Sequence, residues 1–115
     1  MEEEKIDYTR TKKYKELKQS LLRQLQDNDN YTTYFIDLVE LYMSLWVVCQ
    51  KLIADIEFRG VQVKYQNSAT QWGYKKNDSV NELSKTNAQM LKILNQLGIK
   101  ANIKDTNTQE DDDTL

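Results

Sequence analysis

Two pairs of acidic side chains are close enough in the sequence to act together, Asp37 with Glu40 and Asp55 with Glu57. Two neighbouring carboxylates could hold a magnesium ion, because that ion prefers oxygen ligands. Paired acids are also ordinary on the solvent-exposed face of a long helix. We expect the exposed face here, and therefore neither a metal site nor a cofactor.

The sequence lacks the residue types and motifs on which most other kinds of enzyme catalysis depend. The 115 residues include no histidine, which removes the commonest general base and most zinc sites. Gly60, Gly73 and Gly98 lie too far apart to form a phosphate-binding loop. Cys49 is the only cysteine and ends an apolar run, so we expect it to be a small buried residue. The sequence therefore predicts a protein that is not an enzyme.

Basic side chains are a stronger chemical signal. Residues 8–26 contain six Lys and Arg residues against Glu16 alone, a local charge of +5 in a chain whose net charge is −2. Lysine and arginine with interleaved glutamine suit contacts to DNA phosphates. The predicted DNA-binding residues are Arg10, Lys12, Lys13, Lys15, Lys18 and Arg23. Alternatively, this basic face only balances the charge of −5 carried by residues 27–58.

Two amphipathic segments at the start of the chain would position these side chains. Apolar residues recur every three or four positions over residues 8–26, which predicts a helix that ends at the Asp- and Asn-rich segment 27–30. The same period returns over residues 31–59 and predicts a long helix, closed by Gly60 as a left-handed C-cap. The apolar stripe of this second helix comprises Tyr34, Leu38, Leu41, Tyr42, Leu45, Trp46, Cys49, Leu52, Ile53 and Ile56.

This second stripe is wider than one small partner helix can cover. Exposed apolar area of that extent marks an interface, so we expect a homo-oligomer, in the form of a ring. The predicted oligomerisation residues are Leu38, Tyr42, Leu45, Trp46, Leu52 and Ile53.

A stretch without acidic residues follows the second helix. Val61, Val63 and Tyr65 alternate with polar residues, which predicts a first strand, and residues 69–74 could return as its partner after a turn at 66–68. Gly73 would end this small hairpin. Residues 59–77 carry a local charge of +4 and offer an alternative DNA-binding surface, with basic residues Arg59, Lys64, Lys75 and Lys76.

The last helix has a clear start signal. Ser79 followed by Glu82 fits a capping box, and the helix is expected to run from Ser79 to Gly98, a second C-cap. Asn87 occupies a position in its apolar stripe, where it either fixes the register between helices or lies at the edge of the stripe. The expected fold class is all-α: two long helices and a shorter basic N-terminal helix, with a small β-hairpin inserted before the last helix.

The two ends of the chain are polar. Residues 1–7 are expected to be an acidic extension, residues 8–98 a single helical domain for DNA binding and oligomerisation, and residues 99–115 a disordered acidic tail. The N-terminus lacks the apolar core of a signal peptide, and the longest apolar runs fall short of the roughly 20 residues of a membrane span. We therefore expect an intracellular protein with no membrane partner.

The order of these features resembles the small subunit of phage terminase, in the subgroup found in tailed phages of Gram-positive bacteria. That subgroup has a tyrosine-containing helix that ends at glycine, a polar segment with a second glycine and basic residues, and a last helix closed by Leu-Gly. The matching residues are Tyr42, the run Ile56 to Gly60, Asn67, the run Gly73 to Asn77, Val80, Met90, Leu94, Leu97 and Gly98. The family register makes Asn77, not Ser79, the N-cap of the last helix. Asp78 stands where the family has proline, and the Pro-Ser-Arg-like segment often seen after Leu-Gly is missing.

The resemblance implies a non-catalytic packaging factor. Small terminase subunits form rings, recognise the packaging site on double-stranded viral DNA and regulate a large subunit that holds the ATPase and nuclease. Such a protein acts in the host cytoplasm and is not a stable virion component. The resemblance also implies that the tail docks on the large subunit, for which the acidic candidates are Glu110, Asp111, Asp112 and Asp113. Alternatively, the acidic residues only solvate the tail, which then has no partner.

The residues themselves leave two other interpretations open. One is a helical scaffold or adaptor that binds only protein. The other is a small transcriptional regulator, which would need a helix-turn-helix around residues 27–30.

Overall fold

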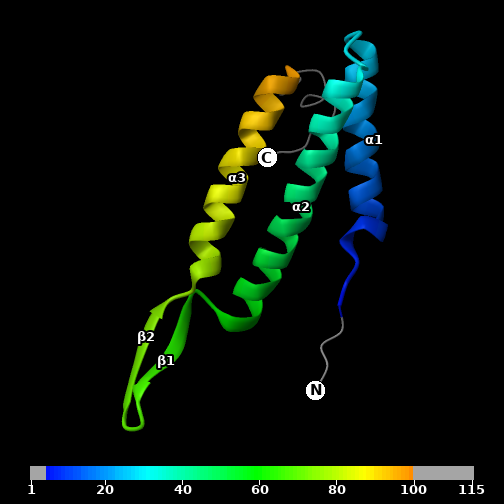
Figure 1. Ribbon diagram of the computed structural model, residues 1–115. Helices are drawn as coiled ribbons and strands as arrows, with labels where there is room; N and C mark the ends of the chain where they lie inside the picture. Colours follow the sequence, from blue (N-terminus) through cyan, green and yellow to red (C-terminus); the bar gives the residue numbers. More distant parts are fainter. Residues whose placement is uncertain (1–4, 100–115) are drawn as a thin grey trace, which may run out of the picture.

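The computed structural model describes residues 5–99, which form three α-helices and one β-hairpin (Figure 1). A 3₁₀ turn, Tyr8–Arg10, precedes α1 (Lys12–Asp27). The long α2 (Thr33–Arg59) is followed by β1 (Gln62–Ser68) and β2 (Gln71–Lys76), and α3 (Asp78–Leu97) closes the order. The predicted mostly helical fold with a small hairpin before the last helix is confirmed. Within residues 5–99, no helix is both long and apolar enough to span a membrane.

The first helix begins later than the sequence predicted. Thr11 has an extended backbone, with φ −78° and ψ 155°, and separates the 3₁₀ turn from α1. Its side-chain oxygen accepts a hydrogen bond from the backbone N–H of Tyr14 at 3.2 Å. The threonine thus satisfies one of the free N–H groups at the start of α1.

The core lies where α1 and α3 flank α2 (Figure 1). Its buried residues are Leu21, Leu25, Val39, Met43, Ile93 and Leu97. The predicted stripe of α2 was therefore partly wrong, because Val39 and Met43 lie innermost while Tyr34 and Leu41 are exposed. Since α2 is apolar around much of its circumference, the period alone did not show which side faces its neighbours.

The two glycine C-caps differ from each other. Gly98 has φ 75° and ψ 18°, the left-handed conformation that the sequence predicted. Gly60 has φ 88° but ψ 175°, so the predicted left-handed cap is wrong there. A positive φ with ψ near 180° is open essentially to glycine alone, and it turns the chain directly into the hairpin.

The hairpin is longer than predicted. Its strands pair antiparallel from Gln62 opposite Lys76 to Ser68 opposite Gln71, with an irregularity between Gln66 and Ser68. Gly73 does not end the hairpin but lies in the middle of β2, opposite Tyr65. A Cβ atom at Gly73 would lie 3.0 Å from the Tyr65 ring, so glycine there makes room for the tyrosine.

The start of α3 corrects a second prediction. Asn77, not Ser79, is the N-cap: its side-chain oxygen accepts from the backbone N–H of Ser79 at 2.9 Å. The capping-box pattern was therefore misleading, and the register implied by the family resemblance is the right one. At the other end of α3, Ile99 is partly buried against the core, although the sequence placed it in the tail.

Candidate nucleic-acid interface

The basic residues near the N-terminus lie on the outer side of α1 and on the turn before it. Arg10, Lys12, Lys13, Lys15 and Arg23 are all exposed. The apolar face of α1, which includes the buried Leu21 and Leu25, packs against the other helices. This division follows from the helical period, which puts the apolar and basic sets of α1 on opposite sides.

Lys18 differs from the other predicted DNA-binding residues. It is half-buried, and its Nζ atom lies 2.7 Å from Oε2 of Glu40 on α2. The hydrogen bond to Glu40 raises the pKa of Lys18. This ion pair ties α1 to α2, so Lys18 helps to orient the helix whose other lysines face solvent.

Lys12 also has an acidic neighbour, but the interaction between the two side chains is weak. Its Nζ atom lies 3.8 Å from Oε2 of Glu16, one turn along α1, and both side chains are highly exposed. An exposed pair of this kind contributes little to stability. Lys12 thus remains available to a polyanion.

Aromatic side chains hold the beginning of α1 in place. The rings of Tyr8 and Tyr14 meet that of Trp46 edge-on, with centroids 6.5 and 5.8 Å away. The 3₁₀ turn, α1 and α2 are therefore joined at one point. In Figure 1, α1 runs back alongside α2, the arrangement of a helical hairpin rather than of a helix-turn-helix, whose helices cross steeply.

Most of the predicted oligomerisation residues pack within this chain. Leu38, Tyr42, Leu45 and Trp46 are partly buried against the core, and burial raises the pKa of Tyr42. Leu52 is half-buried and Ile53 is exposed. The last two lie on the half of α2 nearer the hairpin, away from the core cluster.

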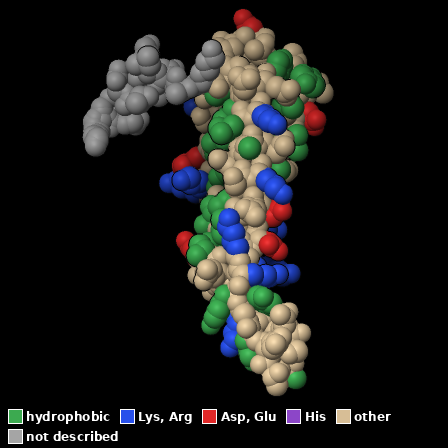
Figure 2. Space-filling model, turned by 90° about the vertical axis from the view of Figure 1, so that its left-hand side faces the viewer, with side chains coloured by type: hydrophobic (Ala, Val, Ile, Leu, Met, Phe, Trp, Pro, Cys, Tyr) green, Lys and Arg blue, Asp and Glu red, His purple; other side chains and the backbone are tan. Residues whose placement is uncertain are grey.

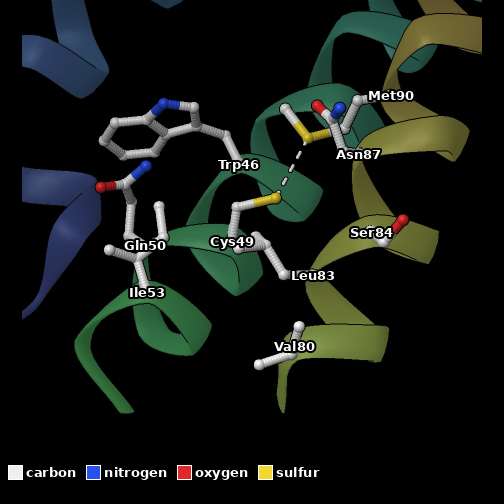
Figure 3. Close-up of a pocket in the computed structure, with 9 residues that line it drawn as sticks. All are labelled: Trp46, Cys49, Gln50, Ile53, Val80, Leu83, Ser84, Asn87 and Met90. Atoms are coloured by element: carbon white, nitrogen blue, oxygen red, sulfur yellow. Dashed lines mark hydrogen bonds between the residues drawn. The ribbon is translucent and has the colours of Figure 1, made fainter. Parts of the chain in front are cut away.

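A groove of about 460 Å³ lies between that half of α2 and α3 (Figure 3). Trp46, Cys49, Ile53 and Met90 give it an apolar lining. Cys49 is buried, as predicted, and its Sγ donates to Sδ of Met90 at 3.5 Å. Burial raises the pKa of the Cys49 thiol, so the residue is held in the less reactive form.

Asn87 also lines this groove. It is exposed, so within one chain it lies at the edge of the apolar stripe of α3. Of the two interpretations of Asn87, the structure therefore supports the edge position.

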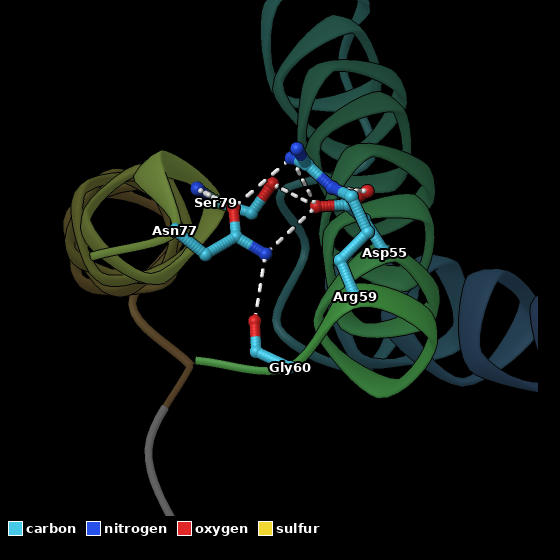
Figure 4. Close-up of polar contacts among 5 residues, drawn as sticks. All are labelled: Asp55, Arg59, Gly60, Asn77 and Ser79. Atoms are coloured by element: carbon cyan, nitrogen blue, oxygen red, sulfur yellow. Dashed lines mark hydrogen bonds and ion pairs between the residues drawn. The ribbon is translucent and has the colours of Figure 1, made fainter. Parts of the chain in front are cut away.

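The sequence did not predict the polar junction, a cluster of Asp55, Arg59, Asn77 and Ser79 at the ends of α2 and α3 (Figure 4). Arg59 donates twice to Asp55, from Nε to Oδ1 at 2.8 Å and from Nη2 to Oδ2 at 2.9 Å. Ser79 Oγ donates to the same Oδ2 at 2.7 Å. The hydrogen bonds from Arg59, and then from Ser79, hold the pKa of Asp55 well below its usual range.

Asn77 lies at the centre of the polar junction and is fully buried. Its Nδ2 donates to Asp55 Oδ2 at 3.1 Å and to the carbonyl oxygen of Gly60 at 2.9 Å. Its Oδ1 accepts from Arg59 Nη2 at 3.1 Å as well as from Ser79 N. One signal in the sequence could have revealed part of this, since Asp55 and Arg59 are spaced i, i+4 on a helix.

One acidic residue of each pair in the sequence contacts a basic side chain. Asp55 belongs to the polar junction, and Glu40 pairs with Lys18. Among residues 5–99, no group of three or more potential metal ligands comes together. The predicted docking residues at 110–113 lie outside the described part of the chain.

Comparison with known proteins identifies the family of this chain. A family profile described as phage terminase, small subunit, matches residues 15–113. Proteins of that family have a packaging-related role and are generally non-catalytic. No curated protein matches the chain, and no solved structure does either. Because the match covers most of the 115 residues, the chain belongs to the phage terminase small-subunit family.

Proposed function

We propose that this protein is the non-catalytic, DNA-binding subunit of a viral terminase, which binds the genome packaging site as a homo-oligomeric ring and regulates the large subunit. Such a protein works in the host cytoplasm on replicated viral DNA and is not a stable part of the virion. The observation that carries the proposal is the family match over residues 15–113 together with the exposed basic face of α1.

The basic face of α1 is the proposed DNA-binding surface. Lys12, Lys15 and Arg23 lie on the side of α1 away from its apolar face and are exposed, with Arg10 and Lys13 beside them. Lys18 helps to hold α1 in place against α2 through its ion pair with Glu40. In a ring the same face repeats in every subunit, so weak contacts to phosphates add through multivalency.

Charge reversal on α1 tests this placement. The triple variant Lys12→Glu, Lys15→Glu, Arg23→Glu should bind duplex DNA far more weakly, because contacts to phosphates release counterions. A matched control reverses three exposed lysines on α2 and α3, namely Lys51→Glu, Lys85→Glu and Lys92→Glu. The measurement is fluorescence anisotropy of a labelled duplex at several salt concentrations. If both triple variants bind as the wild type does, α1 is not the DNA surface. A wild-type protein that binds no DNA would favour the scaffold interpretation instead.

The acidic run Glu110 to Asp113 is the proposed docking segment for the large subunit. It repels DNA, and a run of acids suits a basic surface on a protein partner. Deleting residues 105–115 should weaken stimulation of the large subunit's ATPase while leaving DNA affinity intact. Equal stimulation by the shortened and full chains would show that the segment does not dock.

A further inference from the structure

The β-hairpin projects beyond the helices at one end of the molecule (Figure 1). Nearly every residue of its two strands is exposed, and Val63 and Gly73 are the half-buried exceptions. A two-stranded ribbon with so little burial is only marginally stable in water. An arm of this kind contributes little to the core, so its sequence is free to serve contacts with a partner.

The two faces of the ribbon differ in chemistry. Antiparallel partners point to the same side, and successive residues of a strand alternate. One face, which we call the aromatic–lysine face, consists of the pairs Gln62 with Lys76, Lys64 with Tyr74, and Gln66 with Trp72. The opposite face carries Val63, Tyr65, Gly73 and Lys75. Each face thus has lysine and an aromatic ring, but the two most exposed rings of the hairpin, Trp72 and Tyr74, share one side with Lys64 and Lys76.

Both lysines of the aromatic–lysine face have a defined side-chain contact. Lys64 Nζ lies 4.3 Å from the centroid of the Trp72 ring, a cation–π contact. Lys76 Nζ donates to Oδ1 of Asn81 on α3 at 3.3 Å. Trp72 and Tyr74 remain 57 % and 68 % exposed, although aromatic rings of that size are usually covered.

Charge selects the kind of partner. No acidic residue occurs from Gly60 to Asn77, whereas Lys64, Lys75 and Lys76 are all basic. In Figure 2 the hairpin shows green and blue side chains but no red ones. Among macromolecules, a polyanion complements such a surface best, and the exposed rings add apolar contacts that a purely electrostatic patch lacks.

We propose that the aromatic–lysine face of the hairpin is a second DNA-contacting surface, which lies against a groove of duplex DNA. This inference rests on the proposed function. The major groove of B-form DNA admits a two-stranded β-ribbon. Lys64 and Lys76 contact phosphates at the groove edge, and Trp72 and Tyr74 present N–H, O–H and apolar ring edges to the bases.

This surface is separate from α1. The hairpin lies at the end of α2 opposite the turn that joins α1 to α2 (Figure 1). The polar junction fixes its base, because Asn77 binds the Gly60 carbonyl and the Asn77 N–H donates to the Val61 carbonyl at 2.7 Å. The ribbon therefore has a defined direction relative to the helices, which a contact with a DNA groove requires.

Two neutralised lysines, one on each face, test the proposal. Lys64→Gln changes the aromatic–lysine face, and Lys75→Gln removes the same charge from the opposite face. Binding is measured by anisotropy of a labelled duplex across a salt series, with oligomer mass from light scattering. Lys64→Gln should weaken binding several-fold and lower the salt slope of the affinity by about 1, while Lys75→Gln leaves both unchanged. Trp72→Ala should weaken binding with little change in salt slope, since it removes no charge.

The outcomes separate this inference from the proposed function. If the wild type binds duplex DNA and all three variants match it, the hairpin contact is wrong and the α1 proposal stands. Equal weakening by Lys64→Gln and Lys75→Gln would overturn the face-specific contact. A change of oligomer mass with unchanged DNA affinity would assign the hairpin to subunit contact instead. Tighter binding of a single strand than of the duplex would overturn the groove placement, and a wild type that binds no DNA would remove both proposals.

Discussion

At the scale of single residues, the side chain of Asn77 makes an unusual number of contacts for one amide. It caps α3, binds the carboxylate of Asp55 and the guanidinium of Arg59, and donates to the carbonyl oxygen of Gly60, the C-cap of α2. It is also fully buried. A buried polar group of this kind stabilises the fold only while all its partners are present.

Asn77→Ala should lower the free energy of unfolding by about 2–4 kcal/mol, the sum of a lost N-cap and of polar groups left without partners. Urea unfolding followed by far-UV circular dichroism measures the change. Asn95→Ala, at an exposed position of α3, is the control and should have little effect. An unfolding midpoint equal to that of the wild type would show that the polar junction does not stabilise the fold.

Asp55 should make stability depend on pH. Its pKa is lowered in the folded state by Arg59 and Ser79, whereas the unfolded value is about 3.9. Because the folded pKa is the lower one, the stabilisation is fully present above pH 4 or so and is lost as pH falls through the folded pKa. The gap in melting temperature between the wild type and Asp55→Asn should therefore be constant from pH 7 to about 5 and shrink below pH 4. A gap that stays constant down to pH 2 would contradict this.

At the scale of elements, α2 is the helix around which the others are arranged. Its buried face carries Val39 and Met43, which meet Leu25 of α1 and Leu97 of α3 in the core. Leu41 lies between them in sequence yet points to solvent. The two sides of α2 thus differ in role although both are apolar in composition.

Two substitutions on α2 distinguish these sides. Met43→Ala should cost about 2–5 kcal/mol, because Met43 is fully buried and its removal leaves a cavity. Leu41→Ala should cost about 1 kcal/mol or less, since the side chain is 48 % exposed. Chemical unfolding of both variants measures the difference. Similar losses would mean that Leu41 is covered in the assembled protein.

At the scale of the whole molecule, the described part of the chain, residues 5–99, is elongated. Its extents are 62 × 37 × 27 Å and its radius of gyration is 18.6 Å, whereas a compact chain of this length has a radius of roughly 13 Å. The core lies on one half of α2, while Ile53 and Phe58 are exposed on the other half and Val61 is exposed just beyond its end. This shape leaves apolar surface uncovered in one copy, as expected of a chain that assembles with others.

Light scattering should find a homo-oligomer, and Ile53→Ser with Phe58→Ser should lower its mass. Phe58 is 85 % exposed, so the change should leave the helical content of each chain unaltered. The control pair is Tyr34→Ser with Leu91→Ser, two exposed apolar residues elsewhere on α2 and α3. A monomeric wild type, or equal loss of mass in both double variants, would refute this interface.

Local patterns predicted the elements of this fold because each helix has its own signal. The spacing of apolar residues, the Asp- and Asn-rich turn and the two glycines gave three helices and a hairpin, and the resemblance gave the family, which is confirmed. What the sequence could not give depends on contacts between distant residues. The burial of Val39 rather than Leu41 depends on where α1 and α3 lie, and the role of Asn77 depends on Asp55, which is far away in the sequence.

The basic residues show the same difference between what local sequence patterns predict and what depends on contacts between distant residues. Lys12, Lys15 and Arg23 are exposed on the side of α1 away from its apolar face, which follows from the helical period of the sequence alone. The period could not predict that Lys18 pairs with Glu40 across two helices. Similarly, Arg59 belonged by charge to the basic segment 59–77, but its guanidinium is engaged by Asp55.

The polar junction also makes the hairpin replaceable. Gly60, Val61 and Asn77 are joined directly by hydrogen bonds, so the ends of α2 and α3 are held together whatever lies between them. Ribbons of other lengths or sequences could be grafted onto residues 62–76 without altering how the helices meet. A protein engineer could therefore exchange the arm as a cassette and keep the helical body.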